Sequence, residues 1–363
     1  MIPLRIPVEF EGGSRSPFVA RLAGPDPDAQ GEYDAHLVGE LQDKSVFELD
    51  GGYLSIPAAI ARHAIGDVIL FTPETQSGHR WIRASSPHNT LLVTERCDQL
   101  CVMCSQPPKK SHTDMFGYFR KAVLLAPESM VIGLSGGEPT LFKDELFAFL
   151  EFVREKRPDL SFHVLTNAQH FDPSDKAWLV GPSRRNIVWG VPVYSSDAAL
   201  HDCIVGKQGA FEALCDGLAV LGESGVSIEL RTVLLKENVR QLPELSQFVS
   251  AYLPFVSTWA LMQLENIGFA RNRWSDLFYD NSVDFGPVGQ AIDYAFVRGI
   301  DVRLFNFPLC TVPDEYRLLA ETSISDWKQK FISVCSSCSA KRRCSGFFEW
   351  YDEGRGFERV GAL

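Results

Sequence analysis

Residues 90–110, TLLVTERCDQLCVMCSQPPKK, join a short apolar run to a loop that carries three cysteines. The apolar run predicts a buried strand that ends just before the loop. Cys97, Cys101 and Cys104 have the spacing C-x3-C-x2-C, so three of the chain's 9 cysteines lie in one short turn. Three thiols placed so closely indicate a metal site, a disulfide or a nucleophile. Features elsewhere in the chain distinguish among these.

The composition is that of an ordinary globular protein, with 363 residues of which 45% are hydrophobic and 22% are charged. A formal net charge of −11 argues against a nucleic-acid partner held by phosphate contacts. No apolar run reaches the roughly 18 residues of a membrane helix, and the first residues, MIPLRIPVEFEGGSRS, lack the apolar core of a signal peptide. We therefore expect a cytoplasmic protein without a membrane partner, in which clustered cysteines bind metal or act in catalysis.

Strand-like and helix-like segments alternate from residue 90 to residue 307. Apolar strands separated by helices of about 10–15 residues indicate βαβ units and a parallel sheet. We predict an α/β fold with a partial (β/α)6-type parallel barrel. The expected strands are 90–95, 131–137, 161–167, 186–195, 226–235 and 258–265, with 301–307 as a seventh. The expected helices are 143–158, 209–225, 242–253 and 287–299.

Notable polar and glycine residues stand where these strands end. Cys97 follows the first strand, and Gly136-Gly137-Glu138 follows the second. Asn167 ends the third strand, and Ser195 ends the fourth. Because barrels of parallel strands place their sites at the carboxyl ends of the strands, we expect these residues to share one site.

Three regions differ in pattern. Residues 1–88 contain short strand-like runs punctuated by Gly and Pro, which predicts a small β-rich module that caps the barrel edge. Residues 89–300 contain the barrel pattern. Residues 301–363 form a C-terminal extension that carries a second group of cysteines.

The first cysteine loop does not suit a closed zinc site, because such a site takes four ligands and no further Cys or His follows until His112. A disulfide is disfavoured in a reducing compartment. Cubane iron–sulfur clusters normally take four cysteines. Three thiolates from one loop therefore suit a 4Fe-4S cluster in which one iron keeps a coordination position for a small molecule.

The C-x3-C-x2-C loop after the first strand, together with LSGGEPT at 134–140, resembles the signature of radical S-adenosylmethionine (SAM) enzymes. The resemblance implies that SAM chelates the open iron and is cleaved to a 5′-deoxyadenosyl radical, which abstracts a hydrogen atom from the substrate. It also implies that Gly136, Gly137 and Glu138 bind the SAM amino group. Met103 stands where the family often has an aromatic residue near the adenine, and methionine is an adaptable packing residue.

Further contacts with SAM follow from the resemblance by position. Asn167 and Ser195 occupy positions that often lie near the ribose, and Arg231 occupies one that often lies near the carboxylate. Each has a structural alternative, namely a turn or an ion pair. Glu265 and Asn266 end the sixth strand at the expected site mouth, where they either meet substrate or cap the following helix.

A second cysteine group lies in the C-terminal extension. Cys335, Cys338 and Cys344 have the spacing C-x2-C-x5-C, and Cys310 supplies a fourth ligand. Four thiolates fit structural zinc or a 4Fe-4S cluster. The resemblance favours one auxiliary 4Fe-4S cluster, since many peptide-modifying radical SAM enzymes carry one or more in such extensions. The basic run at 341–343 would offset the charge of an anionic cluster.

Three stretches narrow the resemblance to the C-type maturase of the His-Xaa-Ser peptide-modification system. They are 86–109, 134–142 and 306–331 with the cysteines that follow, and CSQPP at 104–108 is the most distinctive of them. This resemblance implies a ribosomally made peptide or small protein as substrate, and a second, paired radical SAM maturase as partner. The chemistry also requires an electron donor such as flavodoxin or ferredoxin.

Other functions fit parts of the pattern. A radical SAM enzyme that acts on a small molecule or a nucleotide would share every motif of the barrel. A non-catalytic iron–sulfur partner of a second maturase would share the clusters, but the intact cysteine triad and Gly-Gly-Glu segment count against it. A redox sensor would explain the clusters and leave the Gly-Gly-Glu segment unexplained. The sequence assigns no catalytic acid or base.

Overall fold

The computed structural model describes residues 3–25, 31 and 33–363. The chain forms two compact units. The first contains residues 1–93, 113–134 and 142–162, and the second contains residues 94–112, 135–141 and 163–363. The boundaries predicted at residues 88 and 300 divide the chain differently and stay predictions. No helix among the described residues is long and apolar enough to cross a membrane.

The predicted N-terminal β-rich module is confirmed. Its described residues form an eight-stranded sheet in the order β1-β8-β7-β3-β4-β5-β6-β2. The strands are β1 (Arg5–Pro7), β2 (Glu9–Glu11), β3 (Phe18–Ala23), β4 (Asp34–Leu41), β5 (Lys44–Leu49), β6 (Gly52–Pro57), β7 (Val68–Thr72) and β8 (Ser77–Ile82), and helix α1 spans Ala58–Ala64. Their apolar side chains pack into one cluster that includes Leu22, Phe47, Ile56 and Phe71, so the module has a hydrophobic core of its own.

The predicted α/β fold with a parallel sheet is also confirmed. The second sheet has the order β15-β14-β13-β12-β11-β10-β9, and β12 to β15 pair in parallel. The strands are β9 (Asn89–Thr94), β10 (Val131–Gly136), β11 (Ser161–Leu165), β12 (Ile187–Pro192), β13 (Ser227–Val233), β14 (Thr258–Met262) and β15 (Asp301–Phe305). All seven expected strands are therefore present, with ends that differ by a few residues.

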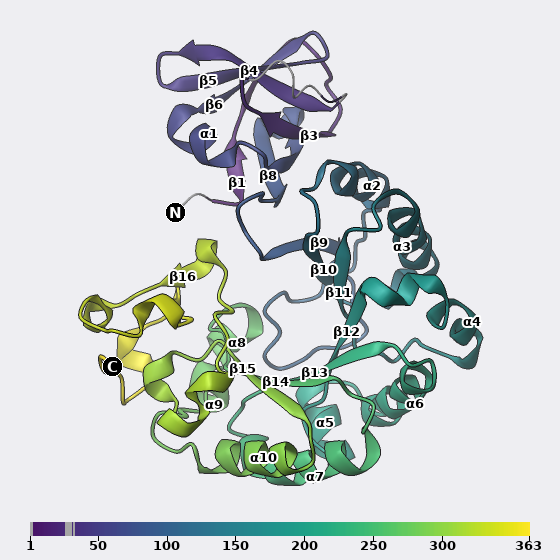
Figure 1. Cartoon of the computed structure of the whole chain (residues 1–363), viewed down its shortest axis with the longest axis vertical. Coiled ribbons are helices and arrows are strands. Elements are labelled where there is room, and N and C mark those ends of the chain that lie inside the picture. The colour runs from purple at the N-terminus through teal and green to yellow at the C-terminus, as the bar shows by residue number, and fades with distance from the viewer. Residues whose placement is uncertain (1–2, 26–30, 32) are drawn as a thin grey trace. The chain divides into compact units, whose positions relative to one another are not determined.

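Side chains alternate between the two faces of this sheet, as the period of a strand requires. In β13, Ile228, Leu230 and Thr232 are buried on one face, whereas Glu229 and Arg231 are only partly buried on the other. Figure 1 shows helices α6, α7 and α10 on one side of strands β12 to β15. Glu229 and Arg231 thus lie on the sheet face opposite to the buried residues of β13.

The helices follow the apolar periodicity of the chain. In α3, Leu146, Phe149, Leu150 and Val153 form the buried face that their spacing predicts. The sequence reasoning did not anticipate α2 or α5, which have 10 and 8 residues. The helices are α2 (Phe116–Leu125), α3 (Lys143–Lys156), α4 (Lys176–Leu179), α5 (Ala198–Val205), α6 (Ala210–Glu223), α7 (Leu242–Tyr252), α8 (Gly268–Asn272), α9 (Trp274–Leu277) and α10 (Gly286–Val297).

The C-terminal segment after β15 consists mainly of short 3-10 turns. Its two short strands, β16 (Gln329–Lys330) and β17 (Phe347–Phe348), pair in an antiparallel ladder. The segment packs on α9, since the indole N–H of Trp274 donates to the carbonyl oxygen of Arg355 over 2.7 Å. Figure 1 shows this segment, coloured yellow, beside α8 and α9.

Candidate functional site

The cysteine loop is held first by the Gly-Gly-Glu segment at the end of β10. The backbone N–H of Gly137 donates to the carbonyl oxygen of Thr94, and that of Glu138 donates to the carbonyl oxygen of Arg96, each over 2.8 Å. A Cβ on Gly137 would lie 2.0 Å from the Arg96 oxygen and 3.1 Å from Cβ of Cys97. Only glycine fits here, because the two backbones approach too closely for a side chain.

A second contact to the loop comes from the end of α5. The backbone N–H groups of Leu100 and Val102 donate to the carbonyl oxygens of Val205 and Ile204, each over 2.9 Å. Gly206 ends α5 in the left-handed conformation, with a φ of 64°, as a glycine at this position of a helix commonly does. A Cβ there would lie 2.7 Å from the carbonyl oxygen of Leu100.

A third contact comes from the start of α8. The backbone N–H of Phe269 donates to the carbonyl oxygen of Cys104 over 2.9 Å. Gly268 has a φ of 56°, and a Cβ on it would lie 2.2 Å from the same oxygen. We call Gly137, Gly206 and Gly268 the glycine clamp, since each lets one segment of backbone press against the cysteine loop.

The three thiols of the loop are partly buried and close to one another. Burial raises the pKa of Cys97 to about 11 and that of Cys101 to about 12, and nearby thiols add to both shifts. No three His, Cys, Asp or Glu side chains among the described residues are already arranged around a metal position. The donor chemistry nevertheless fits an iron–sulfur cluster, because thiolates are the usual ligands of such clusters. The three glycines of the clamp also have no side chains that would push the cysteine loop aside.

Glu138 is buried, with 1% of its surface exposed. Its Oε1 accepts hydrogen bonds from the backbone N–H of Thr140 (2.9 Å), from the Thr140 hydroxyl (2.5 Å) and from the Thr166 hydroxyl (2.6 Å). Its Oε2 accepts from the backbone N–H of Asn167 over 2.6 Å. Burial raises the pKa of Glu138, and these donors oppose that shift. The carboxylate therefore fastens the end of β10 to the end of β11.

Asp98 joins the cysteine loop to the segment after β11. Its carboxylate accepts from the side-chain amide of Asn167 over 2.9 Å and from the ammonium of Lys207, and Nε2 of His170 lies 3.3 Å from it. Burial alone would raise the pKa of Asp98, but the hydrogen bonds from His170 and Lys207 lower it well below its ordinary value. The sequence reasoning missed this residue, because one Asp inside a cysteine motif carries no pattern of its own.

The chain shows partial similarity to several known proteins. No protein-family model matches the chain. The chain is 22% identical over 166 residues to the antilisterial bacteriocin subtilosin biosynthesis protein AlbA of Bacillus subtilis, a match that covers 45% of this chain and 36% of AlbA. It is 32% identical over 160 residues to Fe-coproporphyrin III synthase of Methanosarcina barkeri, with 42% and 38% covered. The chain thus spans less than two fifths of each of these relatives.

The fold is similar to a solved structure. Streptococcus suis SuiB bound to S-adenosylmethionine superposes with a TM-score of 0.50 and 16% identity, over 61% of this chain and 51% of SuiB. This likeness shows a shared fold.

The other residues predicted to contact SAM are placed as follows. Met103 is buried in an apolar cluster with Ile204 and Trp274. Ser195 is buried, and its hydroxyl donates to Oε1 of Gln241 over 2.8 Å and accepts from a backbone N–H. Arg231 pairs with Glu229 on β13. Contact of these residues with SAM stays a prediction.

Tyr194 lies next to the cysteine loop and was missed by sequence reasoning. It is buried at the end of β12, where burial raises the pKa of its hydroxyl well above the ordinary value. The Cys101 and Cys104 thiols raise it further, while Arg231 lowers it. A single tyrosine next to Ser195 gives no sequence signal, so only the fold reveals this neighbourhood.

The thiols of the second cysteine group also lie near one another. The thiols of Cys335 and Cys344 lie close enough to raise the pKa of Cys310, which burial raises most. Backbone N–H groups approach the sulfurs, as those of Leu309 and Gly346 each lie 3.3 Å from Sγ of Cys344. Such donors stabilise thiolates, so this site fits a metal or an anionic cluster.

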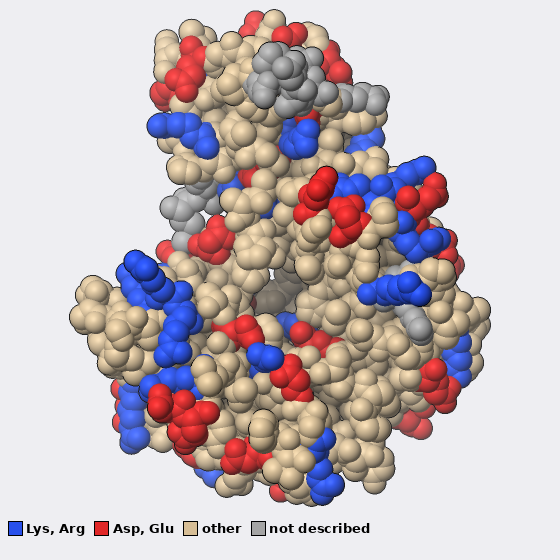
Figure 2. Space-filling model, in the orientation of Figure 1, with Lys and Arg blue, Asp and Glu red and all other residues tan. Residues whose placement is uncertain are grey.

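A basic surface accompanies the second cysteine group. Lys341, Arg342 and Arg343 are exposed in the turn between Cys338 and Cys344. Figure 2 shows Lys and Arg side chains gathered over the C-terminal segment. Positive charge there would favour a site whose thiolates carry negative charge.

Proposed function

We propose that this protein is a radical SAM enzyme whose cluster is held by Cys97, Cys101 and Cys104. The observation that carries the proposal is the glycine clamp, which fixes a C-x3-C-x2-C loop at the carboxyl ends of parallel strands. When bound, the cluster and SAM supply reductive cleavage of SAM to a 5′-deoxyadenosyl radical that abstracts hydrogen from the substrate. The clamp contributes by holding three thiols in one arrangement before any ligand binds.

The chain's own residues would bind and orient SAM. Gly136 has a φ of 138°, a conformation that side chains disfavour, and so keeps the backbone open toward the ligand. Gly136, Gly137 and Glu138 are proposed to meet the amino group, and Asn167, Ser195 and Arg231 to meet the ribose and carboxylate, with Met103 beside the adenine. Glu138 and Asn167 would act chiefly through the backbone they position, because their side chains already bond to protein groups.

The second cysteine group is proposed to hold an auxiliary 4Fe-4S cluster, with zinc as the alternative. Cys310, Cys335, Cys338 and Cys344 supply four thiolates, which would close the cluster to other ligands. A closed cluster transfers electrons or stabilises the fold. The backbone N–H groups near Cys344 support an anionic occupant.

The proposed substrate is a ribosomally made peptide or small protein, of the His-Xaa-Ser type. The name of AlbA supports a peptide product, because that relative serves the biosynthesis of a bacteriocin. A second, paired radical SAM maturase and an electron donor such as flavodoxin or ferredoxin are the proposed partners. The alternatives are an enzyme that acts on a small molecule or nucleotide, and a non-catalytic iron–sulfur partner.

The test is anaerobic reconstitution of the full chain, followed by assay of 5′-deoxyadenosine with SAM and dithionite. We expect product from the wild type and none from the Cys97/Cys101/Cys104→Ala variant. Cys215→Ala is the matched control, because Cys215 lies in α6, outside both cysteine groups. A fully loaded wild type that forms no 5′-deoxyadenosine, even with the paired maturase and precursor, would favour the non-catalytic alternative.

A further inference from the structure

A short basic turn lies within the second cysteine group. Lys341, Arg342 and Arg343 form a 3-10 turn, and all three residues are exposed. The backbone N–H of Lys341 donates to the carbonyl oxygen of Cys338, and the N–H of Cys344 donates to that of Lys341, each over 3.4 Å. The turn therefore begins and ends at two of the four cysteines proposed as ligands.

The three cations of this turn have no acidic partner. None of them forms an ion pair in the part of the chain that the structure describes, whereas Arg317 pairs with Asp314 and Lys328 pairs with Glu265. Adjacent like charges repel one another, and the chain as a whole is acidic, with a formal net charge of −11. An exposed basic turn on such a chain indicates a surface that meets an acidic partner.

Both cysteine groups contact one apolar cluster. Met103 and Cys335 are buried in this cluster, and Cys101 and Cys310 pack against it. The two cysteine groups are therefore connected through packed side chains.

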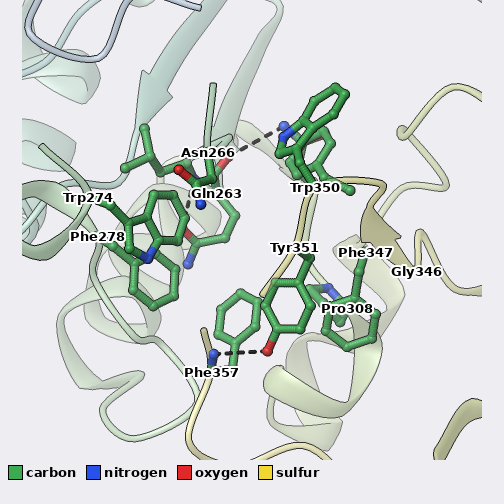
Figure 3. Close-up of a pocket in the computed structure, with 13 residues that line it drawn as sticks. Gln263, Asn266, Trp274, Phe278, Pro308, Gly346, Phe347, Trp350, Tyr351 and Phe357 are labelled. Carbon is green, nitrogen blue, oxygen red and sulfur yellow. Dashed lines mark hydrogen bonds between the residues drawn. The ribbon is translucent and has the colours of Figure 1, made fainter. Parts of the chain in front are cut away.

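Aromatic side chains make up much of this cluster. Trp274 stacks on Phe278 with 4.4 Å between the ring centroids, and the ring of Phe357 lies 5.3 Å from that of Phe278 and 6.4 Å from that of Phe347. Figure 3 shows these rings around a pocket that has room for about one water molecule. The pocket is thus too small for a substrate residue, and the rings form a packed connection between the surroundings of the two cysteine groups.

The pocket also contains two unpaired polar atoms. Oδ1 of Asn266 and Nε1 of Trp350 are buried without a hydrogen bond to any described residue. Asn266 does not cap helix α8, whose cap residue Ile267 makes no side-chain hydrogen bond. Buried polar groups are commonly satisfied by an enclosed water, which suits the size of this space.

We propose that the basic turn at 341–343 docks an acidic protein that donates single electrons, and that the electron enters the chain at the second cysteine group. Opposite charges speed the encounter and orient the donor, and the turn brings the donor to the edge of the site because it lies between Cys338 and Cys344. The donor is oxidised by one electron as a 4Fe-4S cluster in the second cysteine group is reduced by one, and no bond forms or breaks. The inference rests on the proposed function and locates the docking surface of its electron donor.

The test is binding of oxidised flavodoxin, an acidic electron-transfer protein, to the full chain loaded with iron and sulfide. Isothermal titration calorimetry measures it without SAM or reductant, and oxidised 2Fe-2S ferredoxin is titrated in the same way. Calcium-loaded parvalbumin is the comparison probe, as it is acidic and has no redox centre. One variant, Lys341→Gln/Arg342→Gln/Arg343→Gln, removes the charge of the turn, and a second, Lys341→Glu/Arg342→Glu/Arg343→Glu, reverses it.

The matched control for the reversal variant changes the formal net charge by the same amount elsewhere. It is Lys121→Glu/Arg154→Glu/Lys156→Glu, which reverses three exposed cations of α2 and α3 in the first compact unit. Iron content and thermal midpoint are measured for every variant. Where charge reversal lowers the iron content, the variant with three glutamines decides the test.

We expect removal of the charge to weaken flavodoxin binding by about 3- to 10-fold at low salt, and reversal to weaken it by about 10-fold or more. The control should stay within about 2-fold of wild type, and at about 0.5 M salt all four proteins should bind alike. Reduced flavodoxin should reduce the clusters of the reversal variant about 10-fold more slowly than those of wild type. Photoreduced 5-deazariboflavin, a small reductant that needs no docking surface, should reduce both at the same rate.

Equal flavodoxin binding by wild type and the variants of the turn, or no binding of either donor to wild type, would overturn the inference. Parvalbumin binding of equal strength would overturn it too, since the surface would then attract any acidic protein. Zinc in the second site would have the same consequence, because zinc has no redox chemistry.

Formation of 5′-deoxyadenosine with 5-deazariboflavin as reductant separates these outcomes from failure of the proposed function. Normal SAM cleavage with flavodoxin binding that ignores the turn rejects the docking surface and keeps the enzyme. Flavodoxin binding that depends on the turn, in a fully loaded chain that cleaves no SAM, keeps the docking surface and rejects the enzyme.

Discussion

Gly137 and Arg96 are in backbone contact so close that a Cβ on Gly137 would lie 2.0 Å from the Arg96 carbonyl oxygen. The next residue, Glu138, donates its backbone N–H to that same oxygen over 2.8 Å. The end of β10 is thereby tied to the residue just before Cys97. The Gly-Gly-Glu segment thus positions the cysteine loop in addition to any contact with SAM.

Gly137→Ala should displace the cysteine loop. Because the methyl group meets backbone rather than a flexible side chain, one of the two segments must shift. We expect a loss of about 1–3 kcal/mol in the free energy of unfolding and a fall in 5′-deoxyadenosine formation of roughly 100-fold. Urea unfolding and the product assay measure the two effects.

Gly117→Ala is the control for that substitution. Gly117 lies in α2, and a Cβ on it would have no atom of another segment within 4 Å, so alanine there should preserve or raise stability. Wild-type activity in Gly137→Ala would show that the close contact with Arg96 does not matter for the loop.

Glu138→Gln should destabilise the second unit. The carboxylate accepts four hydrogen bonds, and an amide nitrogen in place of one oxygen would face donors that it cannot accept from. The expected loss is about 1–3 kcal/mol, measured by urea unfolding. Glu223→Gln removes an exposed pair with Lys176 and should change stability by less than about 0.5 kcal/mol. Equal effects of the two substitutions would contradict the role given to Glu138.

Stability should fall in mild acid because of His201. Burial lowers its pKa to about 4, against a small opposing effect of Asp202. Between pH 6.5 and 4 the unfolded chain binds a proton that the folded chain does not, so lowering the pH favours unfolding. This group should cost about 2 kcal/mol between pH 7 and pH 5.

His201→Phe tests that pH dependence. The ring of His201 lies 5.4 Å from that of Phe211 and 5.7 Å from that of Tyr194, so phenylalanine preserves the aromatic packing. The variant should lose about 2 kcal/mol less than wild type between the two pH values in urea unfolding. An identical pH dependence would show that His201 does not carry the effect.

Cys344→Ala should empty the second cysteine group and leave the first loaded. With two 4Fe-4S clusters, iron should fall from about eight to about four atoms per chain, while Cys215→Ala retains the wild-type content. A wild type with about four irons and one zinc would assign zinc to the second site. Loss of all iron in Cys344→Ala would show that the two groups do not bind metal independently.

The fold could be predicted from the sequence because the same pattern, an apolar strand followed by a helix, occurs repeatedly along the chain. Seven apolar runs separated by helical periods leave few arrangements other than a parallel sheet, and the apolar face of α3 followed directly from the spacing of Leu146, Phe149, Leu150 and Val153. The two cysteine groups were also visible, since Cys spacing is informative without any tertiary contact.

The remainder of the site depends on contacts between distant segments. Gly206 and Gly268 contact the cysteine loop although each is more than 100 residues away from it in the sequence. A single glycine in a sequence indicates only a turn or a helix end, because the segment that packs against it is visible only in the folded chain. Asp98 and Lys207 form an ion pair over a similar separation. The unpaired atoms of Asn266 and Trp350 are likewise a property of the folded pocket.

The most direct measurement is electron–nuclear double resonance on the reduced chain with SAM labelled with ¹⁵N in the amino group and ¹⁷O in the carboxylate. If the clamped cysteine loop holds a cluster with an open iron, both labels will couple to the cluster in wild type and neither will couple in Cys97/Cys101/Cys104→Ala. A reduced cluster at this loop that shows no coupling to either label would contradict the account.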